Sequence, residues 1–164
     1  MDEIQSKIDS AIRENDTHLQ RLDRAKRLLA EFFPLTEGTF QSLTEEQIEH
    51  IDQFVYRFTK LQDSMGTRLL PAVYSWLEAD SRPVPFLDIL SRLEQLGLIE
   101  DASQWQFFRN LRNNLAHDYP ESVQQTVETL NLLHLSIQEL QSMYSGIREA
   151  CIRRMGEGFS SSFS

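Results

Sequence analysis

The chain has 164 residues, enough for one domain with a buried core, because domains usually comprise about 100 to 200 residues. Its 25 acidic and 16 basic side chains give a net charge of −9. This charge excludes a protein that holds nucleic acid by bulk positive charge, so any such contact must be local. The single cysteine, Cys151, excludes an internal disulfide and a zinc site of several thiolates.

The N-terminal residues lack the basic start and apolar core of a signal peptide, and no later stretch approaches the ~18 uninterrupted apolar residues of a membrane span. We therefore expect a soluble, cytoplasmic protein that does not bind a membrane. Only six glycines and five prolines interrupt the chain, and its apolar residues recur at helical spacing. This pattern predicts an all-α fold.

The first predicted helix spans residues 4–32 and ends at Pro34, with the polar run 14–17 weakening its middle. A second helix is predicted from Thr44, because Thr44 and Gln47 match the capping-box pattern. We expect it to continue toward residue 76, with bends at Gly66 and Pro71.

A short third helix is predicted between Pro85 and Gly97, since glycine favours the left-handed backbone that closes a helix. Ser103 and Gln106 form a second capping-box pattern, which predicts the start of a fourth helix. Pro120 is expected to end it.

Pro120 is also expected in the first turn of a fifth helix, whose apolar stripe extends toward Cys151. Long amphipathic helices joined by short connections favour an antiparallel bundle of four principal helices plus a short extra helix. We expect this bundle to span residues 1–155, followed by a flexible tail at 156–164.

The segment 107–120 concentrates polar groups at the end of the fourth predicted helix. At about 100° per residue, its apolar and polar side chains fall on separate faces. The apolar face carries Phe108, Leu111 and Leu115, and the polar stripe carries Arg109, Arg112, Asn113 and His117. Two guanidiniums supply donors for a phosphate, and an imidazole moves a proton near neutral pH, which suits phosphodiester chemistry.

The arrangement Arg112-Asn113-x-x-x-His117-x-Tyr119 resembles the signature of the HEPN superfamily, in particular the HepT-like toxins of HEPN/MNT type VII toxin-antitoxin pairs. The resemblance implies a homodimeric, metal-independent endo- or exoribonuclease without a cofactor, in which two copies of the motif face one groove. It implies that Arg112 contacts the scissile phosphate, Asn113 orients the site and His117 assists attack by the ribose 2′-hydroxyl. Arg109 then contributes to RNA binding.

The same resemblance implies a cognate minimal nucleotidyltransferase antitoxin that transfers AMP to Tyr119. The added negative charge would occupy the groove where RNA phosphates must lie against Arg109 and Arg112, so the modified toxin would be inactive.

Other interpretations of the motif stay open. The bare spacing also occurs between Arg13 and His18, without the following asparagine or the His-x-Tyr ending. Arg112 and Asn113 are able to cap the helix C-terminus, and Tyr119 to pack in the core. The two alternative functions are a non-catalytic helical binding subunit of a nucleotidyltransferase and a plain helical adaptor.

Remaining polar residues carry weaker signals. A metal site at Glu46, Glu49 and His50 fails on spacing, because a di-iron bundle uses Glu-x-x-His and the residue three before His50 is Gln47. We expect Arg68 to be a solvated helix residue, and His18 and His134 to be surface or boundary histidines. Cys151 is expected to be a buried, inert thiol.

Overall fold

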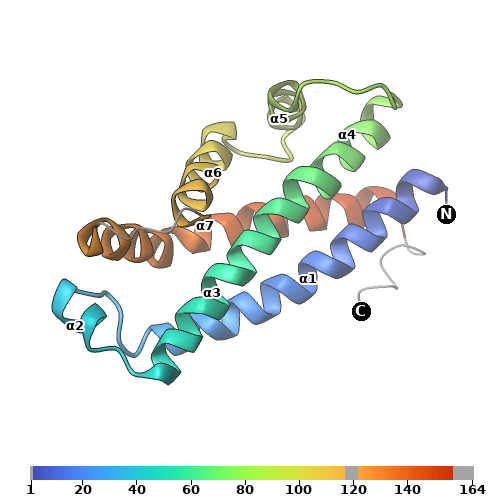
Figure 1. Ribbon diagram of the computed structural model, residues 1–164. Coiled ribbons are helices and arrows are strands. Elements are labelled where there is room, and N and C mark those ends of the chain that lie inside the picture. The colour runs from blue at the N-terminus through green and yellow to red at the C-terminus, as the bar shows by residue number, and fades with distance from the viewer. Residues whose placement is uncertain (1, 117–121, 157–164) are drawn as a thin grey trace.

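The computed structural model describes residues 2–116 and 122–156, and within them it contains helices and no strand. The all-α prediction is confirmed. The elements are α1 (Glu3–Leu29), α2 (Glu37–Gln41), α3 (Glu45–Ser64), the π-helical turn η1 (Met65–Leu69), α4 (Leu70–Glu78), α5 (Phe86–Gln95), α6 (Ala102–Ala116) and α7 (Val123–Met155). Figure 1 shows α1 beside the continuous rod α3–η1–α4, with α7 crossing behind them and α6 leaning on α3. The predicted tail 156–164 lies outside the described residues apart from Gly156.

Helix α1 is continuous through the polar run 14–17, so the predicted weak point is wrong. Asp2 caps the helix, since its side chain accepts a hydrogen bond from the Gln5 amide at 2.8 Å. In the polar run, Asn15 is fully buried, and Asp16 accepts a hydrogen bond from the Tyr144 hydroxyl at 2.6 Å. Glu14 and Asp16 pair with Arg68 and Arg148 of neighbouring helices, and the exposed Thr17 donates a hydrogen bond to the Arg13 carbonyl of its own helix. α1 ends at Leu29, before the expected boundary at Pro34.

The predicted capping box at the start of α3 is confirmed. Thr44 Oγ1 accepts a hydrogen bond from the Gln47 amide at 3.1 Å, and Gln47 Oε1 accepts one from the Thr44 amide at 3.0 Å. The helix then continues past the two expected bend points through η1, where the Leu70 amide donates to the Met65 carbonyl. Pro71 has no amide hydrogen and cannot donate the α-helical hydrogen bond to the carbonyl four residues before it. The wider π turn η1 ends two residues before Pro71.

Gly66 has a packing role within η1. A Cβ atom at this position would lie 2.9 Å from Cζ2 of the buried Trp105 on α6. The absence of a side chain at Gly66 therefore permits the close approach of α6 to the α3–α4 rod.

The third and fourth predicted helices form, with one correction at a helix start. Gly97 has φ +79° after α5, as the C-cap prediction requires. α6 begins at Ala102, one residue before Ser103, so Ser103 is not the N-cap. The Ser103 amide donates to Asp101 Oδ1 at 2.9 Å, as does its hydroxyl at 2.6 Å. These two hydrogen bonds hold the pKa of Asp101 below its usual value.

Helix α7 begins at Val123, capped by Ser122, whose Oγ accepts a hydrogen bond from the Gln125 amide at 3.1 Å. Pro120, expected in the first turn, lies outside the described residues and three positions before the helix starts. α7 runs antiparallel to α1, and Cys151 near its end is fully buried. Burial raises the pKa of the Cys151 thiol to about 12, in agreement with the inert thiol expected from the sequence.

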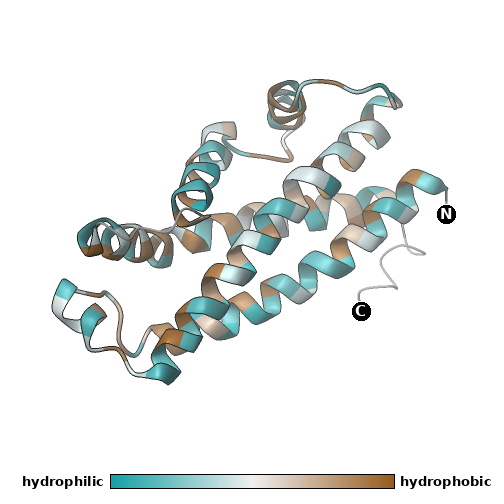
Figure 2. Cartoon of the chain, viewed as in Figure 1, coloured by the Kyte–Doolittle hydropathy of each residue, from teal (hydrophilic) through white to brown (hydrophobic). Residues whose placement is uncertain are grey.

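The core lies between α1, α3, α6 and α7. Figure 2 shows hydrophobic and hydrophilic residues alternating along α1 and α3, as helices with one buried face require. None of the helices in the described ranges combines the length and the apolar run that a membrane crossing requires. The largest fully buried side chains include Trp105, Tyr144, Phe54, Phe58 and Phe108.

Candidate functional site

The polar stripe predicted on the fourth helix lies on α6, beside the face that enters the core. Phe108 and Leu111 are buried, and Arg109 and Asn113 are exposed, with Arg112 between the two faces. Leu115 is only half-buried. The described structure therefore separates the two faces of α6 as the helical periodicity predicts.

Arg112 is paired with an acidic residue. Its Nη2 donates a hydrogen bond to Asp63 Oδ2 on α3 at 3.1 Å, and the two side chains are 29% and 36% exposed. Asp63 lies 49 positions from Arg112, so the residues around the stripe do not reveal this partner. Capping of the α6 C-terminus by Arg112 is not seen either, since its described hydrogen bond goes to the Asp63 carboxylate. Arg112 Nε is buried without an acceptor.

Arg109 and Asn113 make no hydrogen bond or ion pair with the part of the chain that the structure describes. Arg112 and Asn113 lie three and four positions after Arg109, so both are neighbours of Arg109 on the surface of the helix. The charge of Arg109 is thus uncompensated in the described structure. The predicted residues His117 and Tyr119 lie outside the described residues, and α6 is described up to Ala116.

An apolar cavity of about 630 Å³ adjoins the end of α6 and the start of α7. Its lining includes Leu115 and Val123, which flank the undescribed segment, and Val55 and Tyr56 from α3. Tyr56 is 49% exposed, so this groove leaves a large side chain partly open to solvent beside the candidate motif.

A second polar cluster joins α1 to α7 and has a structural role. The Asp16 carboxylate accepts hydrogen bonds from the Tyr144 hydroxyl at 2.6 Å and from Arg148 Nε at 3.0 Å. Burial and the neighbouring Asp16 carboxylate both raise the pKa of Tyr144. The phenol therefore stays protonated across the physiological range and ties the two helices together.

Two further residues differ from the sequence expectations. His18 is 9% exposed, so it is a buried residue of the α1–α3 contact and not a surface histidine. Its Nδ1 lies 3.0 Å from Arg57 Nη1. Arg68 forms an ion pair with Glu14 on α1 and is not simply solvated. His134 is half-buried with its ring centroid 4.7 Å from that of Phe33, a boundary position as expected.

The α6 stripe offers two guanidiniums and an amide to one ligand, and guanidiniums match the geometry of phosphate oxygens. Within residues 2–116 and 122–156, no group of three or more histidine, cysteine, aspartate or glutamate side chains is placed to hold a metal ion. The chain matches no family model, no curated protein and no solved structure. We therefore argue function from the α6 stripe and the helices around it.

Proposed function

We propose that this protein is a metal-independent ribonuclease of the HEPN type and acts as the toxin of a toxin-antitoxin pair. One observation carries the proposal. Arg109, Arg112 and Asn113 form one polar stripe beside the buried Phe108 on the last turns of α6, and His117 follows Ala116, the last residue of α6, in the sequence. Phosphate donors and a proton-transfer group thus follow one another closely in the sequence.

The proposed reaction is transfer of the phosphate within the RNA. His117 accepts the proton of the ribose 2′-hydroxyl, and the 2′-oxygen then attacks phosphorus. The bond from phosphorus to the 5′-oxygen breaks, and the imidazolium returns the proton to that leaving oxygen. The products are a 2′,3′-cyclic phosphate and a 5′-hydroxyl end. Arg109 and Arg112 stabilise the negative charge that develops on the phosphate oxygens.

Asp63 acts in this proposal as a positioning residue. A guanidinium has five N–H donors, and the carboxylate of Asp63 engages Arg112 through Nη2. Apart from the buried Nε, the donors of Arg112 that Asp63 does not engage stay available for phosphate, while the ion pair restricts the rotation of the side chain. A fixed donor lowers the reorganisation required when the substrate binds.

The proposal includes a homodimer and a cognate minimal nucleotidyltransferase antitoxin that transfers AMP to Tyr119. One helix end supplies one copy of Arg112 and His117, and a two-fold axis would bring a second copy to the same groove. The apolar groove beside Leu115 and Val123 supports a protein contact at this end of the molecule.

The second candidate function is a non-catalytic binding subunit of a nucleotidyltransferase. The ion pair between Arg112 and Asp63 favours it, because a paired arginine that joins α6 to α3 has a structural role without any substrate. The two functions differ in one property, since only the ribonuclease requires His117.

The deciding experiment incubates the purified protein with RNA in the presence of EDTA. We expect cleavage by the wild type, and a loss of about 10² to 10⁴ in rate for His117→Ala, the usual contribution of a general acid-base group. Arg27→Ala is the matched control for Arg109→Ala, because Arg27 is an exposed arginine that pairs with Asp23 on its own helix. Cleavage products without the 2′,3′-cyclic end, or no cleavage by dimeric protein free of AMP, would contradict the proposal.

A further inference from the structure

A second basic region lies between α1 and α3, away from the α6 stripe. Here a cavity of about 320 Å³ is lined by Arg21 and Arg24 from α1 and by His50, Gln53 and Arg57 from α3. We call it the basic cavity. None of the described residues that line it carries a carboxylate. Three arginine residues lining one small space are unexpected in a chain with a net charge of −9.

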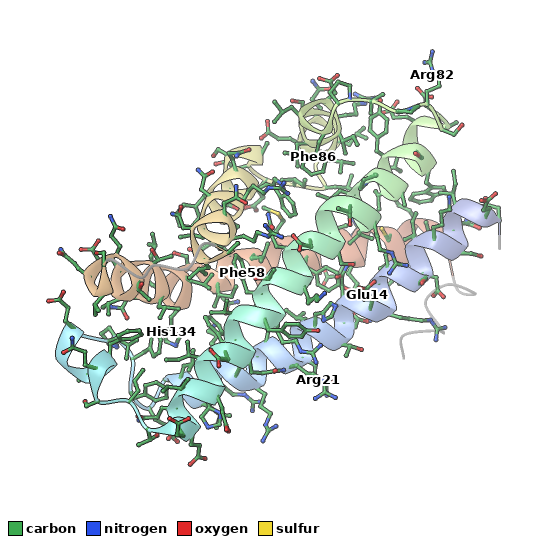
Figure 3. The ribbon with its side chains drawn as sticks, viewed as in Figure 1. Glu14, Arg21, Phe58, Arg82, Phe86 and His134 are labelled. Carbon is green, nitrogen blue, oxygen red and sulfur yellow. The ribbon has the colours of Figure 1, made fainter. Side chains whose placement is uncertain are left out.

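The two arginines of α1 are exposed and uncompensated. Arg21 and Arg24 lie three positions apart, hence on one face of the helix, and form no ion pair within residues 2–116 and 122–156. Figure 3 shows Arg21 pointing away from α1 into open space. By contrast, Arg27 on the next turn is paired with Asp23 at 3.4 Å. Among the described residues, the positive charges of Arg21 and Arg24 are therefore not cancelled by neighbouring carboxylates, whereas that of Arg27 is.

Arg57 is held in place by a neutral group. Its Nη1 donates to His18 Nδ1 at 3.0 Å, which places the imidazole proton on Nε2, 3.5 Å from Glu14. Burial lowers the pKa of His18, so the ring stays neutral with Glu14, Arg57 and Lys60 as its charged neighbours. A neutral anchor fixes the guanidinium without cancelling its charge. In addition, Arg57 Nε is buried without an acceptor.

The carboxylates at the two ends of the cavity limit the shape of the ligand. Glu46 lies 3.7 Å from His50 at one end, and Glu14 lies beside His18 at the other. A phosphodiester strand that continued past His50 would meet the exposed Glu46 carboxylate and be repelled there, whereas the Glu14 carboxylate is ion-paired with Arg68. A compact anion fits between them, and the volume is at the lower end of the ~300 to 1,000 Å³ typical of small-ligand sites.

We propose that the basic cavity binds a compact oligophosphate, a diphosphate or triphosphate group that is either free or attached to a nucleoside. Its guanidiniums would form charge-assisted, bidentate hydrogen bonds with the phosphate oxygens. Ala25 and Leu28 also line the cavity and offer apolar contact to a nucleoside. The inference is independent of the ribonuclease proposal, because no residue of α6 lines this cavity.

The test is isothermal titration calorimetry of the full-length protein in low-salt buffer with EDTA. Tripolyphosphate and ATP are titrated in parallel, and an oligouridylate serves as the strand-like probe. The main variant is Arg21→Gln with Arg24→Gln, because both side chains are exposed and without described partners. Arg27→Gln on the same helix is the matched control. Arg57→Gln is a second variant, with thermal unfolding measured to verify that it folds.

We expect saturable binding of tripolyphosphate or ATP that the double variant weakens by at least tenfold, the effect of losing about one charge-assisted hydrogen bond. Arg27→Gln should change the affinity less than twofold. Similar affinities for tripolyphosphate and ATP would indicate that the ligand is a free oligophosphate. Tighter binding of ATP would indicate that the ligand carries a nucleoside. The proposal is overturned by no binding at millimolar concentration, by unchanged binding in the double variant, or by oligouridylate binding that tripolyphosphate does not displace.

Discussion

Arg112 on α6 and Asp63 on α3 form a hydrogen-bonded ion pair at 3.1 Å, which ties the candidate phosphate-binding helix to the central rod of the bundle. Both groups are about one third exposed, so solvent screens their attraction. The pair consequently contributes orientation of the guanidinium more than stability.

This relationship predicts a separation of activity from stability. Asp63→Asn should lower the free energy of unfolding by no more than about 1 kcal/mol, as for other solvent-screened ion pairs. RNA cleavage should fall by a larger factor, because the Arg112 guanidinium is no longer held by a charge. Urea unfolding and initial cleavage rates measure the two effects. Asp23→Asn, which removes the exposed partner of Arg27, is the control. Equal, small effects of both variants on cleavage would remove Asp63 from the site.

The second prediction concerns Tyr119, which lies outside the described residues. Protein co-expressed with its cognate nucleotidyltransferase should carry AMP on Tyr119 and should not cleave RNA, because the added phosphates compete with RNA for Arg109 and Arg112. Tyr119→Phe should remain active and resist this inactivation. Intact mass spectrometry with peptide mapping is the measurement. Unmodified Tyr119 in protein that the partner has inactivated would rule out the covalent mechanism.

Gly66 provides a third prediction about packing. Gly66→Ala places a Cβ atom 2.9 Å from Cζ2 of Trp105 and should destabilise the protein by about 1–3 kcal/mol, the usual effect of overpacking. Gly146→Ala is the matched control, because nothing lies within 4 Å of its added Cβ inside α7. That variant should be stabilised by about 0.5–1 kcal/mol, since alanine favours helix. Thermal unfolding that ranks the two variants in the opposite order would contradict the packing of α6 on η1.

Tyr144 predicts a pH dependence at high pH. Burial and the Asp16 carboxylate raise the pKa of Tyr144 above its ordinary value of 10.0, so the folded protein keeps a proton that the unfolded chain releases above about pH 10. Fewer protons are then bound in the unfolded state, and the free energy of unfolding falls as pH rises. Tyr144→Phe lacks this proton and should lose less stability between about pH 9 and 11. Parallel slopes for the two proteins in denaturant titrations would disprove the effect, because Cys151 contributes to both.

The sequence alone predicts those features whose partners lie within four residues. The Thr44–Gln47 capping box, the left-handed Gly97 and the separation of Phe108 from Arg109 on α6 all depend on local geometry. The local prediction failed at the start of α6, where the helix begins at Ala102 and the Asp101 carboxylate, not the Ser103 hydroxyl, accepts a hydrogen bond from a first-turn amide, that of Ser103.

Tertiary structure decided which charges are cancelled and which are left for a ligand. Helical periodicity shows which face of a helix is buried, but it contains no information on what that face meets. Arg112 meets Asp63 from 49 positions away, and Arg57 meets His18 from 39. The polar stripe of α6 was therefore visible in the sequence, while the pairing of Arg112 and the convergence of Arg21, Arg24 and Arg57 exist only because α1, α3 and α6 pack side by side.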